Sequence, residues 1–233
     1  MMIQATTDRS VARSCFPGSL PSAARVLAVT ARPGQEAADL GGLVYAFRRS
    51  GASLSLLCLT RGEAGVQGSG TVRLEAARPW EVQMAAMILG VGQVAVASFR
   101  DGSLHHHSTS DVARRIQHAV REYSADLVLV VAPETGDIAD AAVARAATAA
   151  ALQAGVPAAA RTRPGVSGAW IVDLGVDAEV ARAIQRSAAA AHTTQAEALP
   201  GLIDQVEQAG SVEALRWLVA PARLPRARET ISP

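Results

Sequence analysis

The segment VLAVTARPGQE, Val26–Glu36, decides the fold of this chain. It begins with five apolar or β-branched residues, Val26–Thr30, and then breaks into a loop that contains Pro33 and Gly34. A short apolar run that ends at proline and glycine is typical of a buried strand followed by a loop. A helical pattern of apolar residues follows within 37–49. The opening therefore predicts a strand, a loop and a helix in succession.

The same alternation continues along the chain. Further runs that predict strands are Leu54–Leu59, Val94–Phe99, Leu127–Val131 and Trp170–Leu174. Stretches that predict helices are Ala37–Arg49, Arg73–Leu89, Asp111–Tyr123, Ala139–Gln153 and Asp177–His192. Strands that alternate with helices favour a mostly parallel sheet covered on both faces. We therefore predict an α/β fold: a single-domain, Rossmann-like three-layer sandwich in which helices flank the sheet, plus C-terminal helices.

Three regions are expected within this one domain. Residues 1–24 are polar, contain Pro17, Gly18 and Pro21, and predict an irregular N-terminal lead-in. Residues 25–198 carry the α/β pattern. Residues 199–233 predict C-terminal helices and a tail that belong to the same domain.

Composition excludes several classes of protein. The chain has 233 residues, a net charge of +1 and 49% hydrophobic residues, so neither nucleic acid nor an anionic membrane is an expected partner. No run approaches the roughly 18 apolar residues that span a bilayer, and the N-terminus lacks the pattern of a secretory signal. Two cysteines do not make a disulfide framework. We expect a cytoplasmic protein without a membrane span.

The loop sequences resemble one family. The first loop reads Ala-Arg-Pro-Gly-Gln-Glu at 31–36, and a second reads LTRGEAG at Leu59–Gly65. This is similar to the LmbE/PIG-L family, the zinc-dependent N-deacetylases of GlcNAc-type substrates, whose first loop usually reads Ala-His-Pro-Asp-Asp-Glu. The resemblance covers roughly Arg25 to Gln195. It implies the fold given above and, by analogy, a homo-oligomer whose contact surface is formed by the C-terminal helices.

The resemblance also assigns the roles of the zinc centre to positions of this chain. The histidine ligand falls at Arg32, the general-base aspartate at Gly34 and the aspartate ligand at Gln35. In a later segment, the acid histidine falls at Asp137 and the remaining ligand histidine at Asp140. Arginine has no free lone pair for a metal, and glycine cannot act as a base. We therefore expect no metal and no cofactor.

The replacements suggest another source of positive charge. We expect Arg32 to fill the place of zinc and to pair with Asp140, with Asp137 as a second partner, because a guanidinium binds a carboxylate through two parallel bonds. Alternatively, Arg32 points to solvent. Glu36 is retained and is expected to cap the following helix. Gly34 and Gln35 would line the site beside Glu36.

Part of the substrate side resembles the family more closely. By that resemblance, Arg78 and Asp101 hydrogen-bond sugar-like hydroxyls. The alternatives are structural: Arg78 pairs with Glu81 along a helix, and Asp101 forms a turn with Gly102. The segment His192–Gln195 is expected to serve packing and capping.

Three functions remain open, and whether the chain is an enzyme is uncertain. It could have lost zinc hydrolysis and keep a pocket for a sugar-like or amide ligand, or a structural role. It could be a metal-independent deacetylase or amidase in which Asp137 or Asp140 is the base and Arg32 stabilises the oxyanion. Or it could be a zinc deacetylase with other ligands, for example His105–His107, if two of these bind with a carboxylate.

Overall fold

The computed structural model describes residues 20–65, 73–196, 206 and 210–222. Their core is a seven-stranded sheet with the order β3-β2-β1-β4-β5-β7-β6. The strands are β1 (Arg25–Thr30), β2 (Ser53–Thr60), β3 (Gln93–Phe99), β4 (Leu127–Val131), β5 (Ala158–Thr162), β6 (Ala169–Asp173) and β7 (Val212–Val219). The first five strands are parallel, and β7 pairs antiparallel with both β5 and β6. This confirms the predicted α/β sandwich with a mostly parallel sheet.

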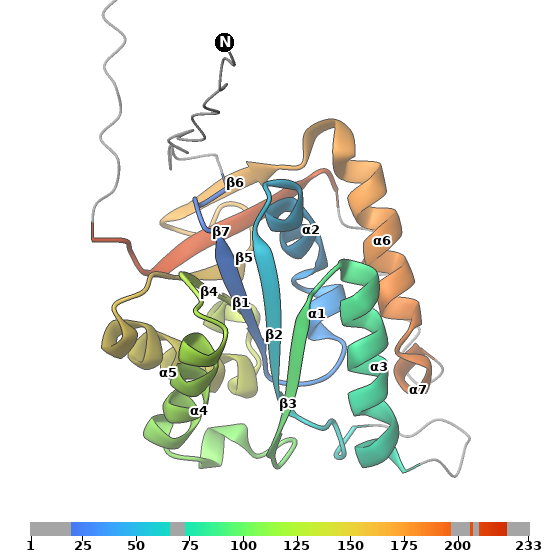
Figure 1. Cartoon of the computed structure of the whole chain (residues 1–233), viewed down its shortest axis with the longest axis vertical. Helices are drawn as coiled ribbons and strands as arrows, with labels where there is room; N and C mark the ends of the chain where they lie inside the picture. The colour runs from blue at the N-terminus through green and yellow to red at the C-terminus, as the bar shows by residue number, and fades with distance from the viewer. Residues whose placement is uncertain (1–19, 66–72, 197–205, 207–209, 223–233) are drawn as a thin grey trace, which may run out of the picture.

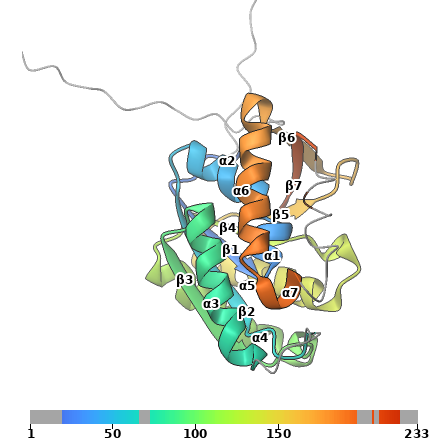
Figure 2. The same cartoon turned by 90° about the vertical axis from the view of Figure 1, so that its right-hand side faces the viewer.

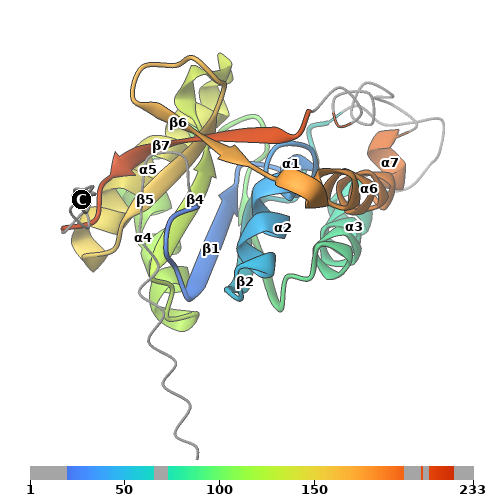
Figure 3. The ribbon, with the colours of Figure 1, turned by 90° about the horizontal axis from the view of Figure 1, so that it is seen from above.

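Helices cover both faces of the sheet (Figure 1). They are α1 (Gln35–Ala38), α2 (Gly41–Arg49), α3 (Leu74–Leu89), α4 (Thr109–Glu122), α5 (Ile138–Ala154), α6 (Ala178–Ala190) and α7 (Thr193–Ala196), with the short 3-10 turns η1 (Leu104–His106), η2 (Pro133–Thr135) and η3 (Gly175–Asp177). Seen from above, α4 and α5 lie on one side of the sheet, and α1, α2, α3 and α6 lie on the other (Figure 3).

Strand β1 shows how the sheet separates two apolar layers. Val26 and Ala28 pack into the layer below α2 and α3, and Leu27 and Val29 pack into the layer below α4 and α5. Because successive side chains of a strand point to opposite faces, the unbroken apolar run of β1 is what a strand buried on both faces requires.

The structure corrects three details. Strand β5, Ala158–Thr162, was not predicted, because alanine is depleted in strands. Residues 212–219 form β7 and not part of a C-terminal helix, because pairing with β5 and β6 overrides their helical propensity. The expected helix 37–49 is divided at Asp39 and Leu40 into α1 and α2.

Most of the lead-in and of the C-terminal helices and tail lies outside the described residues. Among the residues that the structure describes, no helix is both long and apolar enough to cross a bilayer.

Candidate functional site

A cavity of about 460 Å³ opens at the carboxyl ends of β1, β4 and β5. Ligands of open α/β sheets bind at this edge, where the order of strands reverses. The cavity is lined by Arg32, Gln35, Asp39, Ala132, Glu134, Thr135, Asp137, Asp140, Arg161, Thr162, Arg163 and Val166. Four of the residues that were predicted from sequence, Arg32, Gln35, Asp137 and Asp140, therefore meet in one place.

The first loop is held in shape by its own side chains. Gly34 precedes α1 with φ of 96°, a left-handed conformation that favours glycine. Gln35 turns its side-chain oxygen back to accept hydrogen bonds from the backbone N–H of Ala31 at 2.9 Å and of Arg32 at 3.3 Å. Its amide nitrogen is therefore directed away from the loop and toward the cavity.

The other loop that lines the cavity leads from β4 into the start of α5. Asp137 is the N-cap of this helix and accepts backbone N–H groups of Ala139 at 2.7 Å and Asp140 at 3.4 Å. Such a cap satisfies donors that the first turn leaves unpaired. Asp140 lies in that first turn, is buried, and accepts a hydrogen bond from the Thr135 hydroxyl at 3.0 Å.

Two contacts join these loops across the cavity. Arg32 Nη2 lies 2.7 Å from Asp137 Oδ2, and Gln35 Nε2 donates to Asp140 Oδ1 at 2.7 Å. The prediction that Arg32 pairs mainly with Asp140 was therefore wrong, because Arg32 binds Asp137. Asp137 sits at the half-exposed mouth, within reach of the long arginine, whereas Asp140 is turned inward and is bonded to Gln35 and Thr135.

The pKa values of the three charged groups follow from this geometry. Burial raises the pKa of Asp140, and the charge of Asp137 raises it further, while the hydrogen bonds from Gln35 and Thr135 oppose the rise. For Asp137, burial alone would raise the pKa, but the bond and charge of Arg32 outweigh it and the pKa is lowered. Burial would lower the pKa of Arg32, but Asp137 raises it overall. The cavity thus shifts the pKa values of its two aspartates in opposite directions.

We expect the stability of Asp140→Asn, measured relative to the wild type, to increase as pH rises from acid to neutral. The raised pKa means that folded Asp140 holds its proton more tightly than unfolded aspartate. The wild type therefore loses stability as pH rises through the interval between these two pKa values, and asparagine carries no such penalty. Urea denaturation over a pH series measures the difference.

Asp137→Asn is the matched control for this series because its pKa is shifted the other way. Asp137 contributes stability at pH values above the pKa that it has in the unfolded chain. This stability is lost as pH falls through its lower pKa in the folded protein. We expect a loss of at most about 1 kcal/mol, because the Arg32 and Asp137 side chains are 41% and 30% exposed. A pH-independent difference between wild type and Asp140→Asn would contradict the assignment.

Glu36 is fully buried behind the first loop and contacts His192. One carboxylate oxygen accepts the backbone N–H of Gly34 at 3.0 Å, and the other lies within bonding distance of His192 Nε2. The expected cap at the start of α1 is therefore formed by Glu36. His192, which comes from the end of α6, anchors this cap from the opposite side.

The segment around His192 behaves as the predicted packing and capping element. Glu81 of α3 accepts hydrogen bonds from the Thr193 hydroxyl and from both the backbone N–H and the hydroxyl of Thr194, at 2.7–2.8 Å. Gln195 Nε2 donates to Pro33 O at 3.0 Å. Helix α7 thereby ties the first loop to α3.

Arg78 and Asp101, the residues predicted to bind substrate, lie outside the cavity lining. Arg78 is buried and donates to the Gly62 carbonyl and to the Thr194 hydroxyl. Asp101 accepts hydrogen bonds from Thr60 and from the backbone N–H of Ala64, both at 3.3 Å. These contacts hold the loop after β2. A role in ligand binding stays a prediction.

The three consecutive histidines lie in and beside η1. The rings of His105 and His106 stack at 3.8 Å with a 45° tilt, whereas His107 turns to Phe99 at 5.0 Å. Within residues 20–65, 73–196, 206 and 210–222, no group of three or more His, Cys, Asp or Glu side chains is arranged to hold a metal ion.

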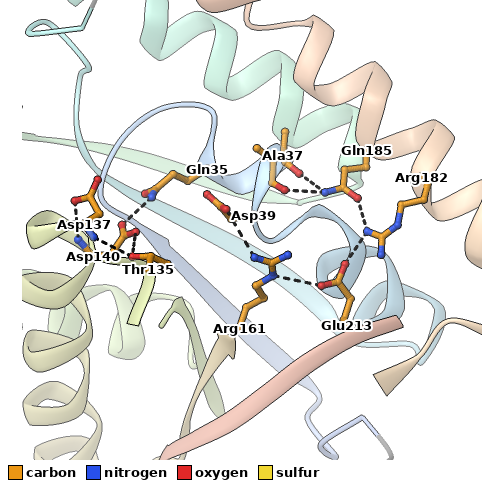
Figure 4. A network of polar contacts seen from close by, with 11 residues as sticks. Gln35, Ala37, Asp39, Thr135, Asp137, Asp140, Arg161, Arg182, Gln185 and Glu213 are labelled. Carbon is orange, nitrogen blue, oxygen red and sulfur yellow. Dashed lines mark hydrogen bonds and ion pairs between the residues drawn. The ribbon is translucent and has the colours of Figure 1, made fainter. Parts of the chain in front are cut away.

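Sequence reasoning missed a polar network that supports the cavity wall (Figure 4). Arg161 of β5 reaches Asp39 Oδ1 at 4.0 Å and donates to Glu213 of β7 at 3.4 Å. Glu213 also binds Arg182 of α6 at 2.6 Å. Arg182 donates to Gln185 at 2.6 Å, and Gln185 Nε2 donates to the Ala37 and Ala38 carbonyls. The network therefore fixes α1, which carries Gln35.

One signal could have revealed Arg161. It stands near the carboxyl end of a parallel strand, where side chains meet the ligand site. That position could be recognised only if the alanine-rich run 158–160 had been identified as a strand. Glu213 and Arg182 gave no comparable signal, because nothing local places β7 beside β5.

Comparisons with known proteins agree with this architecture. Residues 27–152 match the family described as PIG-L, GlcNAc-PI de-N-acetylase. The probable N-acetyl-alpha-D-glucosaminyl L-malate deacetylase 2 of Bacillus anthracis is 30% identical over 113 residues, which cover 46% of this chain and 50% of that protein. The chain thus spans about half the length of the curated relative it matches.

Solved structures share the fold at low identity. The conserved protein TT1542 from Thermus thermophilus has a TM-score of 0.67 and 20% identity, over 87% of this chain and 98% of that one. GalB, the 4-carboxy-2-hydroxymuconate hydratase from Pseudomonas putida, has a TM-score of 0.56 and 19% identity, over 89% and 99%. Because the family match covers more than half of the chain, this protein belongs to the PIG-L family of GlcNAc-PI de-N-acetylases.

Proposed function

We propose that this chain is a PIG-L family protein without zinc-dependent hydrolysis, whose cavity at the ends of β1, β4 and β5 holds a small sugar-like or amide ligand. The observation that carries the proposal is the pairing across the cavity. Arg32 binds Asp137 and Gln35 binds Asp140. These are the four positions that the resemblance assigns to zinc ligands and the acid, and their replacements are bonded to one another.

The donor set does not fit zinc. Arginine keeps its proton and offers no lone pair, and the Gln35 amide directs its donor nitrogen at Asp140. Asp140 is then the single carboxylate left among the three ligand positions, whereas catalytic zinc needs three protein ligands and a water. We therefore derive no catalytic step through a metal.

The cavity wall suits a small polar ligand. Its lining, as far as the described residues form it, combines arginine guanidinium groups, carboxylates and threonine hydroxyls and contains no aromatic ring. Arginine side chains donate hydrogen bonds and carboxylates accept them, whereas hydroxyl and amide groups do both. The curated relative is named for an N-acetylglucosaminyl compound, which supports a ligand of that sugar-like or amide class.

Metal analysis together with ligand binding tests the proposal. Protein from cells grown with added zinc should contain far less than one zinc per chain by elemental mass spectrometry. It should release no acetate from N-acetylglucosamine compounds. Ligand-observed NMR with the same compounds should show binding that is lost in Arg32→Met and kept in Arg114→Met, whose residue is exposed on α4 and lies outside the lining. One zinc per chain with acetate release would overturn the proposal.

A metal-independent amide hydrolase is the second candidate, and the pKa difference between the two aspartates favours one arrangement of it. Asp140 has a raised pKa and is the better base, whereas Asp137 is committed to Arg32 and to the cap of α5. Arg32 at the mouth would stabilise the oxyanion. Activity that survives chelators, vanishes in Asp140→Asn and persists in Asp137→Asn would support this candidate. Equal rates in wild type and Asp140→Asn would remove it.

We also propose a cytoplasmic homo-oligomer. Cys58 is buried and unpaired in the described part of the chain, as is usual in a reducing compartment. The oligomer rests on the family resemblance. The C-terminal helices expected to form its contact surface cannot serve as a whole, since residues 212–219 lie inside the sheet as β7.

A further inference from the structure

Each carboxylate that lines the cavity already contacts a polar or charged side chain of the protein. The contacts are Asp137 with Arg32 at 2.7 Å, Asp140 with Gln35 at 2.7 Å, Asp39 with Arg161 at 4.0 Å and Glu134 with Arg216 at 2.5 Å. As far as the structure describes it, the lining therefore offers a cationic ligand no carboxylate without a partner.

Two donors of the same lining are left over, and they are consecutive in the chain. Thr162, the last residue of β5, is only 5% exposed, yet its hydroxyl forms no hydrogen bond with the described residues. Arg163 follows it and is exposed, and its guanidinium forms neither a hydrogen bond nor an ion pair in the described part of the chain. Because buried polar groups are normally hydrogen-bonded, an acceptor for Thr162 has to come from the cavity.

The two donors stand across the cavity from the first loop. In Figure 2 the loop after β5 projects from the same side of the molecule as the loop that leads into α5, and both contribute to the lining. Strand β4 lies between β1 and β5, and neighbouring strands are about 4.8 Å apart, so the ends of β1 and β5 are separated by roughly 10 Å. A ligand bound at Thr162 and Arg163 can therefore meet Arg32 with another of its groups.

We propose that the ligand of this cavity carries a carboxylate, which binds the Arg163 guanidinium and the Thr162 hydroxyl. The planar guanidinium matches the two oxygens of a carboxylate, and the hydroxyl supplies a further donor. The proposal rests on the proposed function, since the sugar-like or amide part of the same ligand lies toward the first loop. It narrows the ligand class from neutral to acidic compounds.

Charge favours a carboxylate over a phosphate. Arg163 offers one positive charge without a partner among the described residues, and a carboxylate matches it. A phosphate monoester carries nearly two negative charges at neutral pH and would add them to a lining that already holds four carboxyl groups. The raised pKa of buried Asp140 shows that this cavity disfavours additional negative charge.

Two compounds that differ by one carboxylate test the proposal. N-acetylmuramic acid is N-acetylglucosamine with an added lactyl group, and calorimetric titration should show that it binds the wild type about three- to tenfold more tightly. Arg163→Gln should remove this difference and leave the affinity for N-acetylglucosamine unchanged. Thr162→Val should reduce the difference without lowering the urea midpoint, because the hydroxyl has no bond within the described protein to lose.

Arg145→Gln is the matched control. Arg145 is also exposed and without a partner in the described residues, but it lies on α5 outside the cavity lining. The variant removes the same charge and should keep the preference for N-acetylmuramic acid. A preference that survives Arg163→Gln, or that Arg145→Gln removes equally, would overturn the proposal.

The titrations also separate this proposal from the proposed function. Equal affinity of the wild type for the two compounds would overturn the carboxylate contact and leave the sugar-like ligand in place. Binding of neither compound would overturn both. Tighter binding of N-acetylglucosamine 6-phosphate than of N-acetylmuramic acid would overturn the choice of a carboxylate.

Discussion

Replacing Glu213 by alanine is expected to lower the free energy of unfolding by about 3–5 kcal/mol, the usual loss when one partner of a buried ion pair is removed. Glu213 and Arg182 are 3% and 6% exposed, and Arg161 binds the same carboxylate. Without Glu213, the buried guanidinium of Arg182 loses its carboxylate partner, and Arg161 is left with Asp39. Urea denaturation measures the loss.

Two variants separate this effect from a general sensitivity to lost charge. Glu134→Ala removes a partly exposed ion pair with Arg216 and should cost at most about 1 kcal/mol. The double variant Arg182→Met, Glu213→Leu should recover much of the loss, because apolar residues of similar volume often replace a buried pair without penalty. If Glu213→Ala unfolds at the same urea concentration as Glu134→Ala, the network does not stabilise the fold.

Gly34→Asp, which places a carboxylate where the resemblance puts the general base, is expected to destabilise the protein by roughly 1–3 kcal/mol. Gly34 has φ of 96°, beyond the left-handed region that aspartate tolerates. A Cβ there would lie 2.6 Å from Gln195 Oε1. The Gln195 side chain cannot easily move aside, because it is buried and donates to Pro33 O.

A double-mutant cycle with Gln195→Ala divides this loss between backbone strain and crowding. Gly165→Asp is the reference for strain alone: Gly165 has φ of 86°, and a Cβ there would meet nothing within 4 Å. If crowding contributes, Gly34→Asp should cost more than Gly165→Asp and less in the Gln195→Ala background. Gly34→Asp with wild-type stability would contradict both contributions. The first loop is thus shaped around glycine, and a single reversion does not simply return the family's base.

Most of the parallel sheet was predictable because its inner strands β1, β2 and β4 are buried on both faces. The runs that became these strands and the edge strand β3 are mostly apolar, and the structure places them within one residue of the predicted bounds. The sequence did not predict β5 because its residues Ala158–Ala160 are small. Their identity reflects close packing against α5 and β7, which a local pattern does not report.

The candidate site was predictable as a set of positions and not as a set of contacts. The loops at 31–36 and 133–140 follow β1 and β4, so their meeting at one edge of the sheet follows from parallel pairing. Which carboxylate Arg32 would bind depended on one turn of α5. Asp137 caps that helix at the mouth, and Asp140 is rotated inward to Gln35.

The sequence by itself determined the α/β alternation, the family and the convergence of Arg32, Gln35, Asp137 and Asp140. These follow from local apolar periodicity and from loop residues that lie directly after strands. The tertiary structure alone decided the insertion of β7, the Glu213 network behind the cavity and the hydrogen bonds that tie α3 to Thr193 and Thr194. Each depends on contacts between residues far apart in the chain, such as Glu81 with Thr194 and Arg161 with Glu213. The energies of such contacts arise only when packing brings the partners together.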